Sequence, residues 1–360
     1  MSLDRSSLNL FWTGCFCLFG VTLGSVSIRA WMIESGRDLP VSTQAEQPPE
    51  AYSAYTGLPI TKKQAKQRAI GAMIAGDVIT RPQSGLEAAD IVVEMEAATG
   101  ITRLLAIFSS ELPDEIGSIR SARNDFIDVS AGFDAVLVHW GGEKRALDRL
   151  AATDTAEIDQ FANGDLFYRK IDVPAPHNGF TTGELMRDGL LRYDYDRAHD
   201  FKAWEFKEGL EPDDRPAGGT LELTYGSADF DIEYTYDPVT NTYARAQGGT
   251  PHRDNTTQQV ISPSNVLVVR ANHFVYSPNG GYLEIDITNG GPCTLYNNGA
   301  EQDCRWKKGS NEQTPLTITD TAGKGLPFVA GKTWIQVMLP GAPVKWTAEP
   351  EPGTLDLQRQ

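Results

Sequence analysis

Residues 100–150 have the sequence GITRLLAIFSSELPDEIGSIRSARNDFIDVSAGFDAVLVHWGGEKRALDRL, and this stretch decides how the rest of the chain is interpreted. It contains two apolar runs, at residues 104–108 and 135–138, with the length and composition of buried strands. Residues 124–132 and 143–153 have helical patterns, as do residues 181–191 further along. Strands that alternate with helices are typical of an α/β sheet covered on both faces, so we expect an α/β domain over residues 55–216.

Three arginines stand beside the two apolar runs. Arg103 opens the first run, and Arg120 and Arg123 lie in the Ile-Arg-Ser-Ala-Arg turn that follows it. A planar guanidinium binds two oxygens of a carboxylate or phosphate at once, and ligands of α/β sheets collect where strands end. We therefore predict a binding site for an anionic group. The alternative is internal neutralisation by acids of the same chain, namely Asp90, Glu94, Asp125 or Asp128.

The second half of the chain has a different texture. From Gly219 onward, short β-type runs alternate with turn residues, and helical periodicity is hard to find. This pattern predicts an all-β domain over residues 217–342, a sandwich or a partly open barrel. The Pro- and Glu-rich residues 343–360 are expected to form a loose tail.

Length and charge restrict the classes of function. The chain has 360 residues, which is long enough for two domains, and a net charge of −16 with a pI near 4.8. A nucleic-acid partner needs a broad basic face, so this balance argues against one. It also argues against binding to an anionic membrane surface through charge alone.

The start of the chain predicts a membrane anchor. Residues 6–28 carry no charge, and this run is long enough to cross a hydrocarbon core of about 30 Å as a helix. Trp12 and Trp31 lie near its ends, where aromatic rings favour the interface. We expect a transmembrane anchor at residues 6–33 and a flexible polar linker at residues 34–54; a cleaved signal peptide is the alternative.

Two cysteines outside that segment indicate the compartment. Cys293 and Cys304 are placed to face each other across a hairpin whose turn contains Asn298-Gly299, a strong tight-turn signal. A disulfide here implies an oxidising compartment, so the folded part would lie on the extracytoplasmic side of the cell membrane, behind a single-pass anchor. Two unrelated buried thiols are the other interpretation.

Several motifs together resemble the YerB-like bacterial envelope proteins, over a region from about Tyr55 to Leu339. They include Thr-Gly-Leu-Pro at residues 56–59, Arg-Pro-Gln-Ser-Gly at 81–85, Ile-Arg-Ser-Ala-Arg at 119–123, Pro-His-Asn at 176–178 and Gly-Lys-Thr-Trp at 331–334. The resemblance implies a two-domain extracytoplasmic protein, commonly lipid-anchored, without an activity that can be transferred. Cys15 lies inside the apolar run rather than after it, so a helix anchor would replace the lipid.

A second similarity concerns the arginines alone. Thr-Arg before a strand, Ile-Arg-Ser after it and a following Gly-Gly helix are similar to the LytR–CpsA–Psr phosphotransferases of bacterial envelopes, which hold a lipid-linked pyrophosphate with arginines. The Arg-x-Asp-Thr signature of that family is missing here, where Gly-Ile-Thr-Arg stands at residues 100–103. We treat this similarity as an analogy between sites.

Three further polar residues, two histidines and an asparagine, are candidates for the site. His139, which ends the second apolar run, and His177, on a Pro-stiffened loop, are candidate general acids or bases. Asn178, next to His177, is a candidate ligand contact. A histidine at a strand end can equally serve only as a hydrogen-bond partner of a loop.

Two acids lie four residues apart in an expected strand. Asp90 and Glu94 would face the same side, where they could contact the ligand or approach a divalent cation that neutralises it. Pairing with arginines is the structural alternative. The sequence contains no close metal-ligand spacing, Walker loop, dinucleotide fingerprint or nucleophile elbow, so it predicts no cofactor.

Taken together, these features predict a membrane-anchored envelope protein whose α/β domain binds an anionic ligand, either a phosphorylated glycan or a lipid-linked precursor. A non-catalytic scaffold that binds an envelope protein partner through the β domain is the rival hypothesis. A phosphoryl or glycosyl transferase ranks third.

Overall fold

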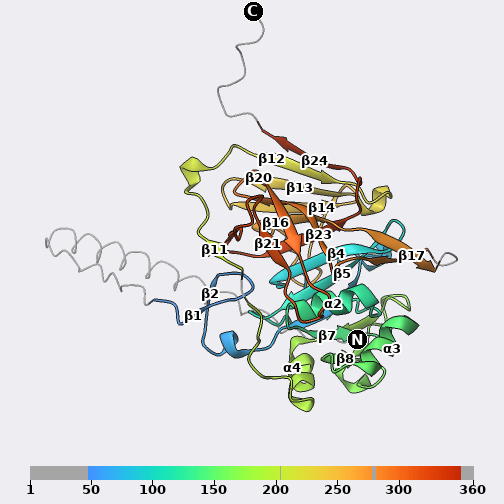
Figure 1. Ribbon diagram of the computed structural model, residues 1–360. Coiled ribbons are helices and arrows are strands. Elements are labelled where there is room, and N and C mark those ends of the chain that lie inside the picture. Colours follow the sequence, from blue (N-terminus) through green and yellow to red (C-terminus); the bar gives the residue numbers. More distant parts are fainter. Residues whose placement is uncertain (1–47, 203, 278–280, 350–360) are drawn as a thin grey trace, which may run out of the picture. The chain divides into compact units, whose positions relative to one another are not determined.

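Figure 1 shows the computed structural model, which describes residues 48–202, 204–277 and 281–349. The expected anchor at residues 6–33 and most of the expected linker at residues 34–54 lie outside these ranges. Within the described residues, no helix is both long and apolar enough to cross a membrane.

A mixed sheet of twelve strands forms the centre of the fold. The N-terminal half contributes β3 (Ile70–Ala75), β4 (Ile91–Ala98), β5 (Ile101–Phe108), β7 (Val136–His139) and β8 (Glu157–Asp159). The C-terminal half contributes β16 (Asn265–Arg270), β17 (His273–Ser277), β18 (Tyr282–Ile285), β19 (Gly290–Asn297), β20 (Ala300–Lys307), β21 (Thr317–Thr319) and β23 (Thr333–Met338).

The two halves of the chain share this sheet. The strand order is β21-β20-β19-β16-β23-β4-β5-β3-β7-β8, and the β17–β18 hairpin attaches to β4. Strand β23 runs parallel to β4, with Ile335 opposite Val93, so a C-terminal strand extends the N-terminal sheet. The fold is mostly β, and among the described residues from 217 onward the regular elements are strands and one short 3-10 turn.

Side chains of the central strands alternate between two cores. In β5, Leu105 and Ile107 pack with helix α2 (Asn124–Gly132), whereas Leu104 and Ala106 face the opposite side. That opposite side packs with helix α4 (Gly183–Arg192) and with a second sheet, which Figure 1 shows at the top of the view. Helix α3 (Lys144–Ala152) lies beside α2. The sequence interpretation expected helices on both faces; here β-strands cover much of one of them.

The second sheet has five strands in the order β15-β14-β13-β12-β24. Their bounds are β12 (Gly219–Leu223), β13 (Ile232–Asp237), β14 (Thr242–Gln247), β15 (Thr250–Pro251) and β24 (Val344–Ala348). Strand β24 lies in the segment 343–360 that was expected to be loose. It pairs with β12, and the partly buried Trp346 packs over Gly219, so strand pairing and this contact hold the start of the segment in place.

A buried ion pair joins the two sheets. Arg245 of β14 donates to Glu94 of β4 at 2.7 Å, and both side chains are fully buried. The Trp334 indole lies over the Arg245 guanidinium at 4.4 Å and donates to the same carboxylate. Because an isolated buried charge is very unfavourable, each partner depends on the other.

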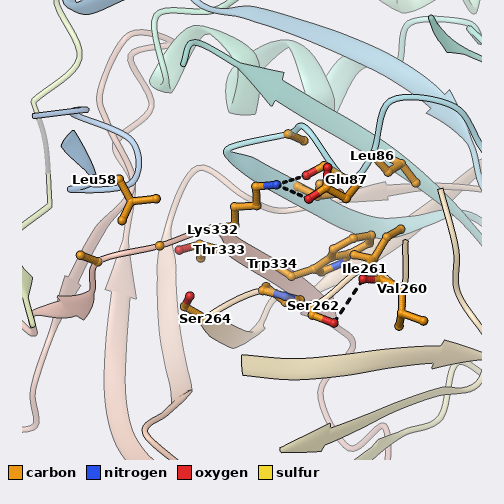
Figure 2. Close-up of a pocket in the computed structure, with 15 residues that line it drawn as sticks. Leu58, Leu86, Glu87, Val260, Ile261, Ser262, Ser264, Lys332, Thr333 and Trp334 are labelled. Carbon is orange, nitrogen blue, oxygen red and sulfur yellow. Dashed lines mark hydrogen bonds and ion pairs between the residues drawn. The ribbon is translucent and has the colours of Figure 1, made fainter. Parts of the chain in front are cut away.

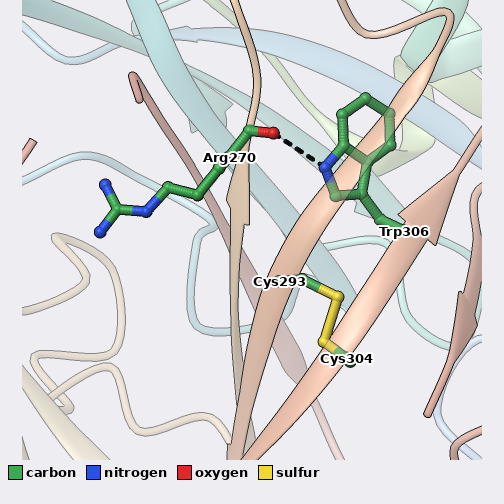
Figure 3. The surroundings of a disulfide bond; sticks show 4 residues. All are labelled: Arg270, Cys293, Cys304 and Trp306. Carbon is green, nitrogen blue, oxygen red and sulfur yellow. Dashed lines mark hydrogen bonds between the residues drawn. A yellow bond between two sulfur atoms is a disulfide. The ribbon is translucent and has the colours of Figure 1, made fainter. Parts of the chain in front are cut away.

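The predicted disulfide is present. Cys293 and Cys304 face each other across the β19–β20 hairpin and are bonded, as Figure 3 shows. The two-residue turn is formed by Asn298 and Gly299, with φ of 51° and 69°. Positive φ at both positions matches the twist of a tight hairpin and explains the Asn-Gly pair.

Candidate anion-binding site

The candidate site lies at one edge of the twelve-stranded sheet. Strands β3, β7 and β8 are parallel and end at this edge, and the antiparallel β5 begins there. The turn at residues 119–123 crosses the edge: Ile119 bridges to Ile74, and the Arg120 amide donates to the Met73 carbonyl at 2.8 Å. Arg103 lies opposite Ala75 in the antiparallel pairing of β5 with β3, at the same edge. The backbone thus brings all three arginines together.

Arg103 is the innermost of the three. Its side chain is buried, its Nη1 donates to the Ser121 carbonyl at 3.3 Å, and its Nε has no hydrogen-bond partner in the described structure. Burial, together with the positive charges of Arg123 and Arg120, lowers the pKa of Arg103 to about 9. The lowered pKa reflects chiefly the burial of a guanidinium that forms no ion pair in the described structure, with the two neighbouring positive charges acting in the same direction.

Arg120 and Arg123 also retain unpaired donors. The Arg120 Nη1 donates to the Pro176 carbonyl at 3.2 Å, and the Nε atoms of both residues are buried without a partner among the described residues. Arg123 donates to the Tyr276 hydroxyl at 3.0 Å, lies 3.5 Å from Glu143 and stacks over the Tyr282 ring at 4.3 Å. Within the described residues, Arg123 alone of the three forms an ion pair.

The acids that could have neutralised the arginines are engaged elsewhere. Asp128 pairs with Arg149 at 2.7 Å, Glu94 pairs with Arg245, and Asp125 accepts from the Ile285 and Phe126 amides. Asp77 raises the pKa of Arg103 slightly but forms no ion pair with it in the described part of the chain. Internal pairing therefore leaves an excess of positive charge at this edge.

Asp90 and Glu94 do not join the site. Asp90 accepts from the Ser109 and Ser110 amides at 2.6 and 2.8 Å, at the far end of β5. Six residues separate Arg103 from Ser109, which corresponds to roughly 20 Å along a strand. Glu94 points toward the second sheet. Among the described residues, no group of acids, histidines or cysteines is arranged to hold a metal ion, and the divalent cation stays a prediction without a site.

His139 has a structural environment. It is fully buried, with Nδ1 2.8 Å from the Gly141 carbonyl and Nε2 3.0 Å from Glu157. Both ring nitrogens are occupied within the fold, so the geometry offers no route for His139 to contact a ligand. Sequence reasoning could not separate this arrangement from a catalytic one.

The two loop residues differ. The pKa of His177 is lowered, first by burial and then by the nearby charge of Arg120, and its Nδ1 is buried without a partner in the described structure. His177 therefore borders the cluster. Asn178 instead accepts from Arg169 at 2.6 Å and donates to the Lys170 carbonyl, so it holds its own hairpin together.

Three residues of the site carry no sequence signal. Tyr276 and Tyr282 come from the β17–β18 hairpin, and Glu143 immediately precedes α3. The hairpin lies about 150 positions beyond Arg123 and reaches the site because β18 pairs with β4 at Ala98. Only the three-dimensional pairing reveals that contact.

A separate cavity of about 300 Å³ is shown in Figure 2. Its walls are largely apolar and include Leu86, Ile261 and Trp334. Its cation, Lys332, is paired with Glu87 at 2.8 Å. Because that charge is already neutralised, this cavity is a poorer candidate for an anion than the arginine cluster.

The fold and the site together define a mostly β protein in which three arginines gather where strands β3, β7 and β8 end. The chain belongs to the family of proteins of unknown function designated DUF3048: residues 55–196 match its N-terminal domain, and residues 221–335 match its C-terminal domain. The resemblance to YerB-like proteins is thereby confirmed.

A relative and a solved structure agree with this assignment. The chain is 33% identical over 297 residues to YerB of Bacillus subtilis (strain 168), whose name describes a candidate lipoprotein; the match covers 79% of this chain and 85% of that protein. The crystal structure of YerB from Bacillus subtilis superimposes with a TM-score of 0.73 at 29% identity, covering 82% of this chain and 99% of that one.

Proposed function

We propose that this protein is a membrane-anchored, extracytoplasmic envelope protein that binds a phosphate- or carboxylate-bearing ligand at Arg103, Arg120 and Arg123. The observation that carries the proposal is the gathering of three guanidiniums whose buried Nε donors have no partners in the described structure and of which only Arg123 forms an ion pair there. Buried donors normally find an acceptor, and an anion supplies several acceptor oxygens at once.

Three observations support the location. The uncharged run at residues 6–28 has the length of a membrane span, the Cys293–Cys304 disulfide suits an oxidising compartment, and the name of the relative YerB describes a candidate lipoprotein. A helix anchor would place the cationic edge on the side of the membrane where envelope polymers and their precursors occur.

Calorimetric titration of the purified chain with inorganic phosphate at low ionic strength tests the binding. Hydrogen bonds to charged groups contribute about 1.5–3 kcal/mol each, so Arg120→Ala combined with Arg123→Ala should weaken binding by roughly 100-fold or more. A matched control is Arg192→Ala with Arg253→Ala, which removes two exposed guanidiniums away from the site. Equal phosphate affinity in the wild type and the site variant would rule the proposal out.

A further inference from the structure

Aromatic side chains of the β17–β18 hairpin lie next to the arginine cluster and extend away from it. Arg123 lies over the Tyr282 ring at 4.3 Å, and the Tyr282 and Tyr276 rings stack with centroids 6.0 Å apart. Arg145 of α3 then lies 5.2 Å from the Tyr276 centroid and 5.9 Å from the Phe274 centroid. We call this series, Arg123, Tyr282, Tyr276, Arg145 and Phe274, the aromatic track.

The outer part of the track is accessible. Phe274 is 50% exposed, Tyr282 is 38% exposed, and the Arg145 side chain is 49% exposed. Large aromatic side chains that remain exposed next to a charged site mark contact surfaces more often than isolated ones do. The track therefore offers contact area that begins at the buried arginines and extends outward.

The chemistry of the track favours rings over bare charge. Arg145 is paired with Glu284, and the Tyr276 hydroxyl donates to Glu143, so carboxylates lie along its length. These carboxylates repel a dense polyanion but accept hydrogen bonds from hydroxyl groups. The faces of sugar rings carry C–H groups, which contact aromatic rings as other apolar groups do. The edges of sugar rings carry hydroxyl groups, which can donate hydrogen bonds to carboxylates.

We propose that the ligand is an extended acidic glycan, with one acid group held by Arg103, Arg120 and Arg123 and the following sugar units lying along the aromatic track. This inference rests on the proposed function, since it uses the same arginine cluster as the anchor point. The net charge of −16 disfavours a nucleic acid, the other common ligand with charges and rings.

The test compares probes of different length on the full-length chain. Galacturonate and neutral oligosaccharides of three and six units that carry a single uronic acid at one end are titrated, with inorganic polyphosphate as a polyanion without rings. We expect the hexamer to bind at least about tenfold more tightly than the monomer, because linked units engage adjacent subsites. Arg145→Ala with Phe274→Ala should abolish most of that gain and leave monomer affinity unchanged. Lys144→Ala, at an exposed neighbour of Arg145, is the matched control.

The outcomes separate this inference from the proposed function. Monomer and phosphate binding without a gain in affinity for the hexamer would overturn the track and leave the anion site standing. Polyphosphate or a short oligonucleotide binding as tightly as the hexamer would also overturn it, because charge or bases would then explain recognition. No binding of any probe, phosphate included, would overturn both.

Discussion

Two buried arginines should respond in opposite directions to the same substitution. Arg103 and Arg245 are both almost completely buried, but Arg245 is paired with Glu94 at 2.7 Å and Arg103 has no carboxylate partner in the described structure. Methionine keeps much of the aliphatic stem and removes the charge. We predict that Arg103→Met stabilises the ligand-free protein and that Arg245→Met destabilises it.

The magnitude follows from the electrostatics. Burial and like charges lower the pKa of Arg103 to about 9, and at about 1.4 kcal/mol per pH unit the charged form is disfavoured by at most about 5 kcal/mol. Loss of the hydrogen bond to Ser121 and imperfect filling offset part of this, so we expect a gain of about 1–3 kcal/mol in the free energy of unfolding. Arg245→Met leaves Glu94 buried without its partner and should lose about 3–5 kcal/mol.

Urea denaturation in a buffer free of phosphate and sulfate measures both variants. Added phosphate at a concentration c should then stabilise the wild type by RT ln(1 + c/Kd) and should have little effect on Arg103→Met. If Arg103→Met is destabilised as much as Arg245→Met, Arg103 is an ordinary structural residue and the reasoning about unbalanced charge fails.

Three further predictions concern the scaffold. Burial, with smaller contributions from Glu284 and Glu143, raises the pKa of Asp125 to about 7; the native state thus holds a proton that the unfolded state releases near pH 4, and stability should fall as pH rises from about 4 to 7. Denaturation at several pH values measures this slope, and an equal slope in Asp125→Ala would exclude Asp125 as its source. Reduction of the Cys293–Cys304 disulfide should lower the free energy of unfolding by about 2–3 kcal/mol, measured by melting with and without reductant; an unchanged melting temperature would contradict this. His139→Gln should lower stability by about 1–3 kcal/mol through lost buried hydrogen bonds and leave phosphate affinity unchanged, so weaker phosphate binding would instead give His139 a role at the site.

Local signals carried much of the prediction. The helix expected at residues 124–132 coincides with α2, and the Asn-Gly turn with its flanking cysteines forms the expected hairpin. The gathering of the three arginines was also accessible, because Arg103 opens a strand and the other two lie in the turn that crosses its end. These features depend on residues close together in sequence.

Contacts between residues far apart in the sequence could not be predicted from the sequence. Glu94 is directed away from the arginines because Arg245, about 150 positions later, enters the layer between the sheets. Tyr276 and Tyr282 reach Arg123 because β18 pairs with β4. Strand β23, also from the second half of the chain, pairs with the same strand in parallel. Period-two alternation assigns a side chain to one face of a strand, but not to the partner that it meets there.

A crystal structure of the chain grown in ammonium sulfate tests the central claim most directly. We expect a sulfate within hydrogen-bond distance of the Nε atoms of Arg103, Arg120 and Arg123, and its absence from the same crystals of Arg120→Ala with Arg123→Ala. The contrary result is an anion-free cluster in which the guanidiniums have turned to pair with Asp77 and Glu143, because the charge at this edge would then be balanced by the protein itself.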